Sequence, residues 1–171
     1  GGETWHPVLP EAPSILCLAA AGDRLAGGLQ EEGLLLSEDL GRTWHREEAF
    51  VGRGLARLCA AGDRLLAFGA MEGAWWTDDG QEWQPLPGLA PEMLPLASLE
   101  AAERAEGLVV LAGTAAGLLA WHGDAGPQVL GEGTFASGGM VTALAFSPAF
   151  AQDGLIWAGQ ECGSLWHSRD G

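Results

Sequence analysis

The chain has 171 residues, a mass of 17.8 kDa and a net charge of −15, with an isoelectric point near 4.4. This excess of negative charge disfavours nucleic acid and anionic membrane surfaces as partners, and no run approaches the roughly 20 apolar residues of a membrane-spanning helix. All eight basic residues are arginine and tyrosine is absent, a bias typical of a GC-rich bacterial genome. We therefore predict neither a nucleic-acid partner nor insertion into a membrane.

From the N-terminus onward, short apolar segments bounded by Gly, Pro and Asp recur as units of similar length. We predict the last strand of one unit over residues 1–6, three units over 14–46, 54–84 and 94–131, and a unit over 140–171 that lacks its last strand. Segments of about four to six residues have the length of strands and are too short for helices. Four strands in about 40–45 residues is the spacing of one β-propeller blade. The predicted fold is therefore all-β, with about four propeller blades of four antiparallel strands in one domain.

Two series of glycines give the register of these units. Gly22 and Gly62 each begin the phrase Gly-Asp-Arg-Leu, which we place between the first and second strands. The second series marks the start of each third strand, in steps of 40, 44 and 46 residues, and consists of Gly33, Gly73, Gly117 and Gly163. Residues 101–106 are the one stretch for which we predict a helical turn.

A motif of the form S-x-D-x-G-x-T-W follows the third strand, and we call it the box. Ser37 and Asp39 can accept hydrogen bonds from backbone amides in a tight turn, and Gly41 can supply the positive φ that the turn needs. We expect the box tryptophan to enter the outer strand and pack between blades. A calcium loop needs more oxygen ligands at set positions, so we predict a structural role. The predicted box residues are Ser37, Asp39, Gly41, Thr43, Trp44, Thr77, Asp79, Gly80, Trp83, Asp124, Gly126, Ser168, Asp170, Thr4 and Trp5.

The box resembles the Asp-box, or BNR, repeat of sialidases, sortilin-type receptors, xyloglucan-cleaving hydrolases and photosystem II assembly factors. The phrase FSPAFAQDG over residues 146–154 is similar to a segment common in bacterial BNR-like repeat proteins. The resemblance implies a propeller in which the box lies away from the ligand-binding face, and a secreted or periplasmic location. It implies no single function, because one repeat fold supports many activities.

The cysteines and histidines give no sign of a reactive centre. We expect Cys17, Cys59 and Cys162 to act as small apolar side chains, with Cys162 the most accessible to reagents because it lies in a turn. The four histidines lie near the boxes and do not converge, so no zinc site is predicted. We predict no metal, no cofactor and no catalytic residue.

Candidate ligand-binding residues come from the turns between second and third strands, which share one face of a propeller. The glutamates in these turns are Glu31, Glu32, Glu72 and Glu161. They can form a solvated rim, a site for a cation or basic partner, or paired carboxylates for glycoside cleavage.

Three classes of function follow: a non-catalytic binding or scaffold propeller for a protein or a glycan, a glycoside hydrolase, and an assembly factor. A sialidase-like mechanism, as the resemblance implies, requires a tyrosine nucleophile, and this chain has none. In a xyloglucanase-like enzyme, the catalytic residues would lie mostly outside the 171 residues of this chain. The assembly factors, as the resemblance implies, present an arginine patch, whereas we expect this face to be acidic. We therefore predict a binding or scaffold propeller, with a fragment of a glycoside hydrolase as the alternative.

The two ends of the sequence carry complementary parts of one box, Ser-Arg-Asp-Gly at residues 168–171 and Gly-Glu-Thr-Trp at residues 2–5. This arrangement fits either an arc of a larger propeller or a closed four-bladed ring, because propellers have about four to eight blades. We expect the open arc, whose exposed end blades would allow self-association.

Overall fold

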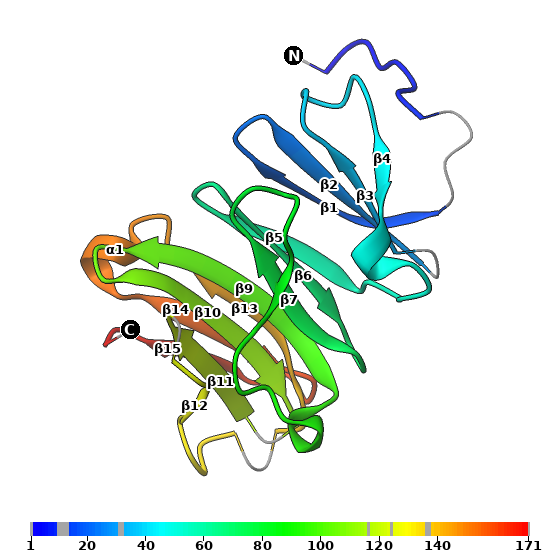
Figure 1. Cartoon of the computed structure of the whole chain (residues 1–171). Coiled ribbons are helices and arrows are strands. Elements are labelled where there is room, and N and C mark those ends of the chain that lie inside the picture. The colour runs from blue at the N-terminus through cyan, green and yellow to red at the C-terminus, as the bar shows by residue number, and fades with distance from the viewer. Residues whose placement is uncertain are drawn as a thin grey trace.

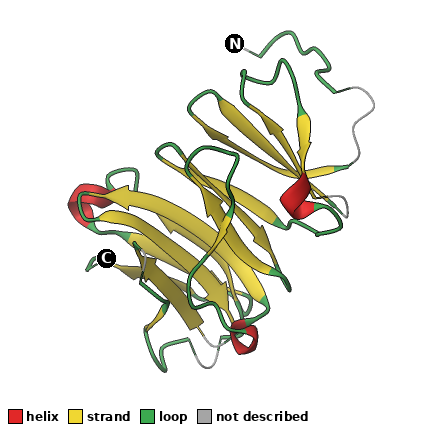
Figure 2. Cartoon of the chain, in the orientation of Figure 1, coloured by secondary structure: helices red, strands yellow, loops and turns green. Residues whose placement is uncertain are grey.

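The computed structural model describes residues 2–9, 14–30, 33–115, 117–123, 125–135 and 138–170. They form four antiparallel sheets that follow one another along the chain, and we call these sheets blades A to D (Figures 1 and 2). Blade A contains β1 (Ile15–Ala21), β2 (Arg24–Leu29), β3 (Gly33–Ser37) and β4 (His45–Glu47). Blade B contains β5 (Arg57–Ala61), β6 (Arg64–Gly69), β7 (Gly73–Thr77) and β8 (Gln84–Pro85). Blade C contains β9 (Leu96–Arg104), β10 (Gly107–Thr114), β11 (Gly117–His122) and β12 (Gln128–Leu130). Blade D contains β13 (Val141–Phe146), β14 (Ile156–Gln160) and β15 (Leu165–Ser168).

Tight hairpins connect neighbouring strands in each blade. Gly22 and Gly62 adopt positive φ angles of 57° and 56° in the turns before β2 and β6, a conformation that glycine adopts without a Cβ clash. Gly33 is needed for a different reason, since a Cβ there would lie 2.3 Å from the carbonyl oxygen of Phe50. This close approach brings the start of β3 against the segment that leads into blade B.

The hydrophobic core is divided into three clusters, and each cluster lies between two adjacent blades. Leu36 of blade A packs with Leu58 and Leu65 of blade B. Leu66 of blade B shares a second cluster with blade C, and Leu111 of blade C shares the third with blade D. No blade buries both of its faces alone, as expected for a repeat protein.

The blades form an open array. The first strands β1, β5, β9 and β13 lie side by side in chain order, and blades A and D lie at opposite ends (Figure 1). The prediction of an all-β fold made of propeller blades, arranged as an open arc, is confirmed. Apolar side chains are exposed on both end blades: Leu16 and Leu18 of β1 are 55% and 66% exposed, and Leu165 of β15 is 76% exposed.

The end faces follow from strand alternation. Cys17 and Ala19 pack toward blade B, so Leu16 and Leu18 between them face away from it. In blade D, Leu165 lies beside Gly159 and Ala143, on the opposite face from Leu144 and Ala158, which pack against blade C. An apolar sheet face is thus presented at each end of the arc.

Three local predictions from the sequence are wrong. Residues 101–104 continue strand β9, and no helix forms there, because Ala101, Ala102, Glu103 and Arg104 pair with β10. Residues 2–6 form no strand, since no described strand lies beside them to complete a ladder. The box tryptophans precede the fourth strands, which begin one residue later, at His45 and at Gln84.

Helical structure in the described residues is limited to three short pieces. These are η1 (Glu48–Phe50), η2 (Pro91–Met93) and α1 (Phe150–Asp153), drawn in red in Figure 2. The first two lie in the connections between blades, and α1 contacts β9. In the part of the chain that the structure describes, no helix has the length and apolar character needed to span a membrane.

Candidate functional site

The box at residues 37–44 is a turn closed by its own side chains. The Ser37 hydroxyl donates to Asp39 Oδ1 (2.9 Å) and accepts from the amide of Gly41 (2.8 Å). The Asp39 carboxylate accepts from the amide and the hydroxyl of Thr43 at 2.8 and 2.6 Å. Gly41 has a φ of 84°. These bonds fix the path of the chain from β3 into β4.

The same chemistry recurs in the later boxes. The amides of Gln81 and Glu82 donate to Asp79 Oδ1 at 2.8 and 3.0 Å, and the hydroxyl of Thr77 bonds the same oxygen. The hydroxyl of Ser168 bonds Asp170. Gly80, like Gly41, has a positive φ, of 83°.

These hydrogen bonds lower the pKa of the box carboxyls because they stabilise the ionised form. Bonds from Thr43 lower the pKa of Asp39 from 3.8 to about 2. The amides of Glu82 and Gln81 lower the pKa of Asp79. The box aspartates are therefore charged acceptors at neutral pH and not proton donors.

The remaining predicted box residues are placed differently. Asp124 lies outside the described residues, and Gly126 and Thr4 are exposed. Trp5 is 87% exposed, and its indole N–H donates to the carbonyl of Gly2. Trp44 is half-buried and folds back on its own turn by donating to the carbonyl of Gly41 (2.9 Å).

Trp83 packs between blades. Its ring stands edge-on to Phe50, which lies in the connection from blade A to blade B, with centroids 4.9 Å apart. The ring of Trp75 in β7 also stands edge-on to Phe50, with centroids 5.4 Å apart. The box tryptophan of blade B thus completes a three-ring cluster at the boundary between blades A and B.

Two of the four predicted ligand-face glutamates have a described position in the structure. Glu31 and Glu32 lie outside the described residues. Glu72 is in blade B, where its carboxylate accepts from the amide of Gly54 (3.4 Å). Glu161 is in blade D, and blade C lies between the two. The described residues contain no group of three or more His, Cys, Asp or Glu side chains arranged to hold a metal ion.

A wide groove of about 660 Å³ runs along the first strands β1, β5 and β9. Arg57 and Glu100 lie within it, 3.8 Å apart. Burial raises the pKa of Glu100 and of Cys17, and it raises the pKa of Cys59 to about 12. Both thiols are therefore protonated at neutral pH, which makes them poor nucleophiles.

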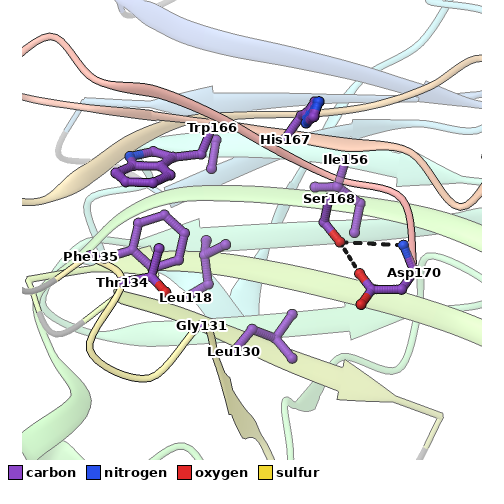
Figure 3. A pocket seen from close by; sticks show the side chains of 11 residues that line it. Leu118, Leu130, Gly131, Thr134, Phe135, Ile156, Trp166, His167, Ser168 and Asp170 are labelled. Atoms are coloured by element: carbon purple, nitrogen blue, oxygen red, sulfur yellow. Dashed lines mark hydrogen bonds between the residues drawn. The ribbon is translucent and has the colours of Figure 1, made fainter.

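A second cavity, of about 390 Å³, lies between blades C and D, and we call it the C–D pocket (Figure 3). Its size falls within the roughly 300–1,000 Å³ typical of ligand pockets. Leu118, Leu130 and Ile156 give it an apolar wall, and the rings of Phe135 and Trp166 stand edge-on with centroids 5.8 Å apart.

Polar groups lie at one end of this pocket. Ser168 and Asp170, joined by their hydrogen bond, are separated from the two rings by the apolar wall (Figure 3). The bond from Ser168 lowers the pKa of Asp170. His167 and Thr134 add exposed polar groups, and Thr134 lies beside Phe135 at the end of the rings (Figure 3). The pocket can accept an apolar or aromatic group at one end and hydrogen-bond donors at the other.

The pocket opens beside the edge of β15. In the described residues, β15 pairs with β14 on one side and with no strand on the other. Its backbone can therefore accept a further strand beside the aromatic rings. The sequence did not predict this site because Leu118, Phe135 and Trp166 lie far apart along the chain. The signal that could have found it is a phenylalanine six or seven residues before a first strand, at Phe50 and again at Phe135.

No protein-family profile and no curated protein matches the chain. Among solved structures, the computationally designed Ika4 protein superposes with a TM-score of 0.70 at 15% identity, over 92% of this chain and 91% of that one. YCF48 bound to a D1 peptide gives 0.62 at 16% identity, over 90% of this chain and 50% of that one. A GH74 enzyme of Niastella koreensis gives 0.66 at 16% identity, over 94% of this chain and 23% of that one.

The chain thus spans half of the matched YCF48 chain and about a quarter of the GH74 enzyme. YCF48 and the GH74 enzyme are β-propeller proteins. At these identities the likeness shows the fold alone, and it agrees with the blade topology.

Proposed function

We propose that this chain is a non-catalytic Asp-box propeller segment that binds a protein partner, by accepting an aromatic-bearing strand in the C–D pocket. The observation that supports this proposal is the edge-on pair of Phe135 and Trp166 in the C–D pocket, beside the edge of β15 that no described strand covers. A strand added to a sheet edge gains main-chain hydrogen bonds, and an adjacent pocket selects its side chains. Buried aromatic anchors supply much of the affinity of such contacts.

The similar solved structures agree with this proposal at the level of the fold. YCF48, a propeller of similar architecture, has been captured bound to a D1 peptide. Binding of a polypeptide is thus compatible with this architecture. The residues that we propose for binding in this chain are those of the C–D pocket.

The alternative is a part of a glycoside hydrolase, as similarity to blades of a GH74 enzyme suggests. Hydrolysis of a glycosidic bond requires two carboxyl groups that face the same sugar. Three cavities lined by described residues contain one carboxylate each: Asp170 in the C–D pocket, Glu100 in the groove and Glu72 in a smaller cavity beside β7. This distribution favours binding over hydrolysis.

The proposal is tested by titrating a peptide that corresponds to residues 80–86, in which Trp83 is the anchor, into 13C-methyl-labelled protein. The protein carries Trp5→Ala, so that its own exposed tryptophan cannot compete. We expect the methyl signals of Leu118, Leu130 and Ile156 to shift. The same peptide with alanine in place of its tryptophan should bind at least about tenfold more weakly. Shifts confined to other blades, or equal binding of the two peptides, would exclude the C–D pocket as the site.

A further inference from the structure

The first glycine of a third strand is covered by a phenylalanine in blades A and C. A Cβ on Gly33 would lie 3.3 Å from the Cβ of Phe50, which stands in the connection from blade A to blade B. A Cβ on Gly117 would lie 3.5 Å from the ring of Phe135, in the connection from blade C to blade D. The two phenylalanines therefore hold equivalent places in these connections.

In blade B a leucine holds this place. Leu89 stands seven residues before β9, as Phe50 stands seven residues before β5. Its Cδ2 would lie 3.6 Å from a Cβ on Gly73, the first residue of β7. Leucine has no ring and fills less space than phenylalanine, and a cavity of about 250 Å³ lies here. We call this cavity the Leu89 pocket.

The walls of the Leu89 pocket are mostly apolar. They come from β7, from β8 and from the connection to blade C, and blade B has blade A on one side and blade C on the other. The apolar side chains are Trp75, Pro85, Leu86, Leu89, Pro91 and Leu94. The volume is below the roughly 300–1,000 Å³ of pockets for small molecules. It suits a single side chain of a larger partner.

One carboxylate lies among these apolar walls. Glu72 is exposed, and it is the one charged residue among the described residues that line the pocket. Its Oε1 accepts a long hydrogen bond of 3.4 Å from the amide of Gly54. In the part of the chain that the structure describes, no arginine or histidine forms an ion pair with Glu72. The carboxylate can therefore accept hydrogen bonds from a cation that enters the pocket.

The aromatic wall favours a guanidinium group. The guanidinium carbon of Arg53 already lies 4.9 Å from the centre of the Trp75 ring, and Arg53 does not line the pocket. A planar guanidinium stacks on aromatic rings and binds a carboxylate through two parallel hydrogen bonds. The aliphatic stem of an arginine packs on apolar surface while its charged end stays near water. The pocket offers a surface for each of these parts.

We propose that the Leu89 pocket binds an arginine side chain of a protein partner, with the guanidinium on the Glu72 carboxylate and the stem against Leu89 and Pro91. The net charge of −15 attracts a basic partner over a longer range. Glu92, exposed beside Pro91, adds to this charge locally. The inference goes beyond the proposed function, because it concerns a separate site on blade B and does not depend on the C–D pocket.

A pair of peptides tests the charge directly. Acetyl-Ala-Ala-Arg-Ala-Ala-amide and the same peptide with citrulline, which has a similar shape and no charge, are titrated into 13C-methyl-labelled protein. We expect the arginine peptide to bind about two- to fivefold more tightly, the range of an exposed ion pair. The methyl signals that should shift are those of Leu86, Leu89 and Leu94, which line the pocket. Shifts of Leu118, in the C–D pocket, without these would overturn the inference.

A double-mutant cycle assigns the charge to one residue. In Glu72→Gln protein the arginine and citrulline peptides should bind equally, because the group that distinguishes them is gone. Glu106→Gln is the matched control, since Glu106 is an exposed glutamate in the hairpin between β9 and β10, and it should keep the preference for arginine. A preference that persists in Glu72→Gln, or is absent from the parent, would overturn the inference.

Leu89→Phe tests the shape of the pocket. This change supplies the ring that Phe50 and Phe135 provide in the other two connections, so it should close the pocket. We expect the arginine peptide to bind at least about tenfold more weakly, with a urea unfolding midpoint close to that of the parent. Unchanged binding by the folded variant would overturn the inference. If this variant does not fold, the cycle at Glu72 decides the question.

The inference and the proposed function fail in different ways. Failure of the tryptophan peptide to shift the signals of Leu118, Leu130 and Ile156 removes the C–D pocket as a site and leaves the Leu89 pocket untouched. Equal binding of the arginine and citrulline peptides removes the Leu89 pocket and leaves the C–D pocket untouched.

Discussion

The hydroxyl of Ser98 in β9 donates a buried hydrogen bond of 2.8 Å to the carbonyl of Val141 in β13. This bond joins the first strands of blades C and D. Gly113 of β10 lies at the same crossing, where a Cβ would stand 1.9 Å from the Val141 oxygen and 2.3 Å from Ser98 Oγ. The spacing of blades C and D is therefore set by backbone atoms that leave no room for a side chain.

Gly113→Ala should separate these two blades. Because the nearest atom is a backbone oxygen, the strands must move, and overpacking of a core typically costs about 1–3 kcal/mol. We expect a loss of unfolding free energy at or above the upper end of this range in urea titrations. Gly126→Ala is the matched control, since a Cβ there meets nothing within 4 Å, and equal stability of the two variants would contradict the account.

Trp121→Phe should weaken the contact between blades B and C. Trp121 is fully buried, and its indole N–H donates to the carbonyl of Pro87 (2.8 Å). Removal of this donor leaves a carbonyl without its partner, which costs about 1–3 kcal/mol. Urea unfolding of Trp121→Phe should show this loss. Trp5→Phe, a change at an exposed ring, should show none when both are measured at a concentration where the protein is monomeric.

Acid should weaken the box turns over a pH range that lies below the ordinary pKa of an aspartate. The folded pKa of Asp39 is about 2, below its usual 3.8, so the carboxylate stabilises the fold above the unfolded value. This contribution is lost as the pH falls from about 3.8 toward 2. We expect Asp39→Asn to be less stable than the parent at pH 6 and to approach it at pH 2. The exposed Glu38→Gln change serves as the control, and a constant difference across this range would contradict the assignment.

The three thiols should react with a disulfide reagent in the order of their exposure. Cys162 is exposed, Cys17 is half-buried and Cys59 is buried with its pKa raised to about 12. At pH 8 we expect one fast equivalent, which Cys162→Ser removes, and no reaction of Cys59 until the protein unfolds. Fast modification of Cys59 in the folded protein would show that blades B and C open readily.

The strands were largely predictable because their signals are local. Glycines at fixed spacing mark the turns, and the short apolar runs between them become β1 to β15 with shifts of only a few residues at most ends. Residues 101–104 were predicted wrongly because alanine and glutamate favour helices in isolation, whereas pairing with β10 decides their conformation. The short helix α1 went unpredicted. It ends at Gly154, which has a φ of 60°.

The C–D pocket was not predictable in the same way. Its walls come from β11, from the connection after β12 and from β15, and their proximity depends on how blades C and D pack. The glutamates that seemed to share a face came from single turns, and Glu72 and Glu161 ended on blades that are not neighbours. A repeated sequence therefore predicts each blade well and the surfaces between blades poorly.

The central claim is that the C–D pocket binds an aromatic side chain of a partner, and 19F NMR of protein labelled with 5-fluorotryptophan tests it most directly. The Trp166 signal is assigned by its loss in Trp166→Phe, and its solvent isotope shift is followed as the peptide of residues 80–86 is added. Trp166 is 38% exposed in the structure, and we predict that its signal loses its solvent isotope shift as the peptide binds. A solvent isotope shift of Trp166 that does not change at saturating peptide would contradict the account.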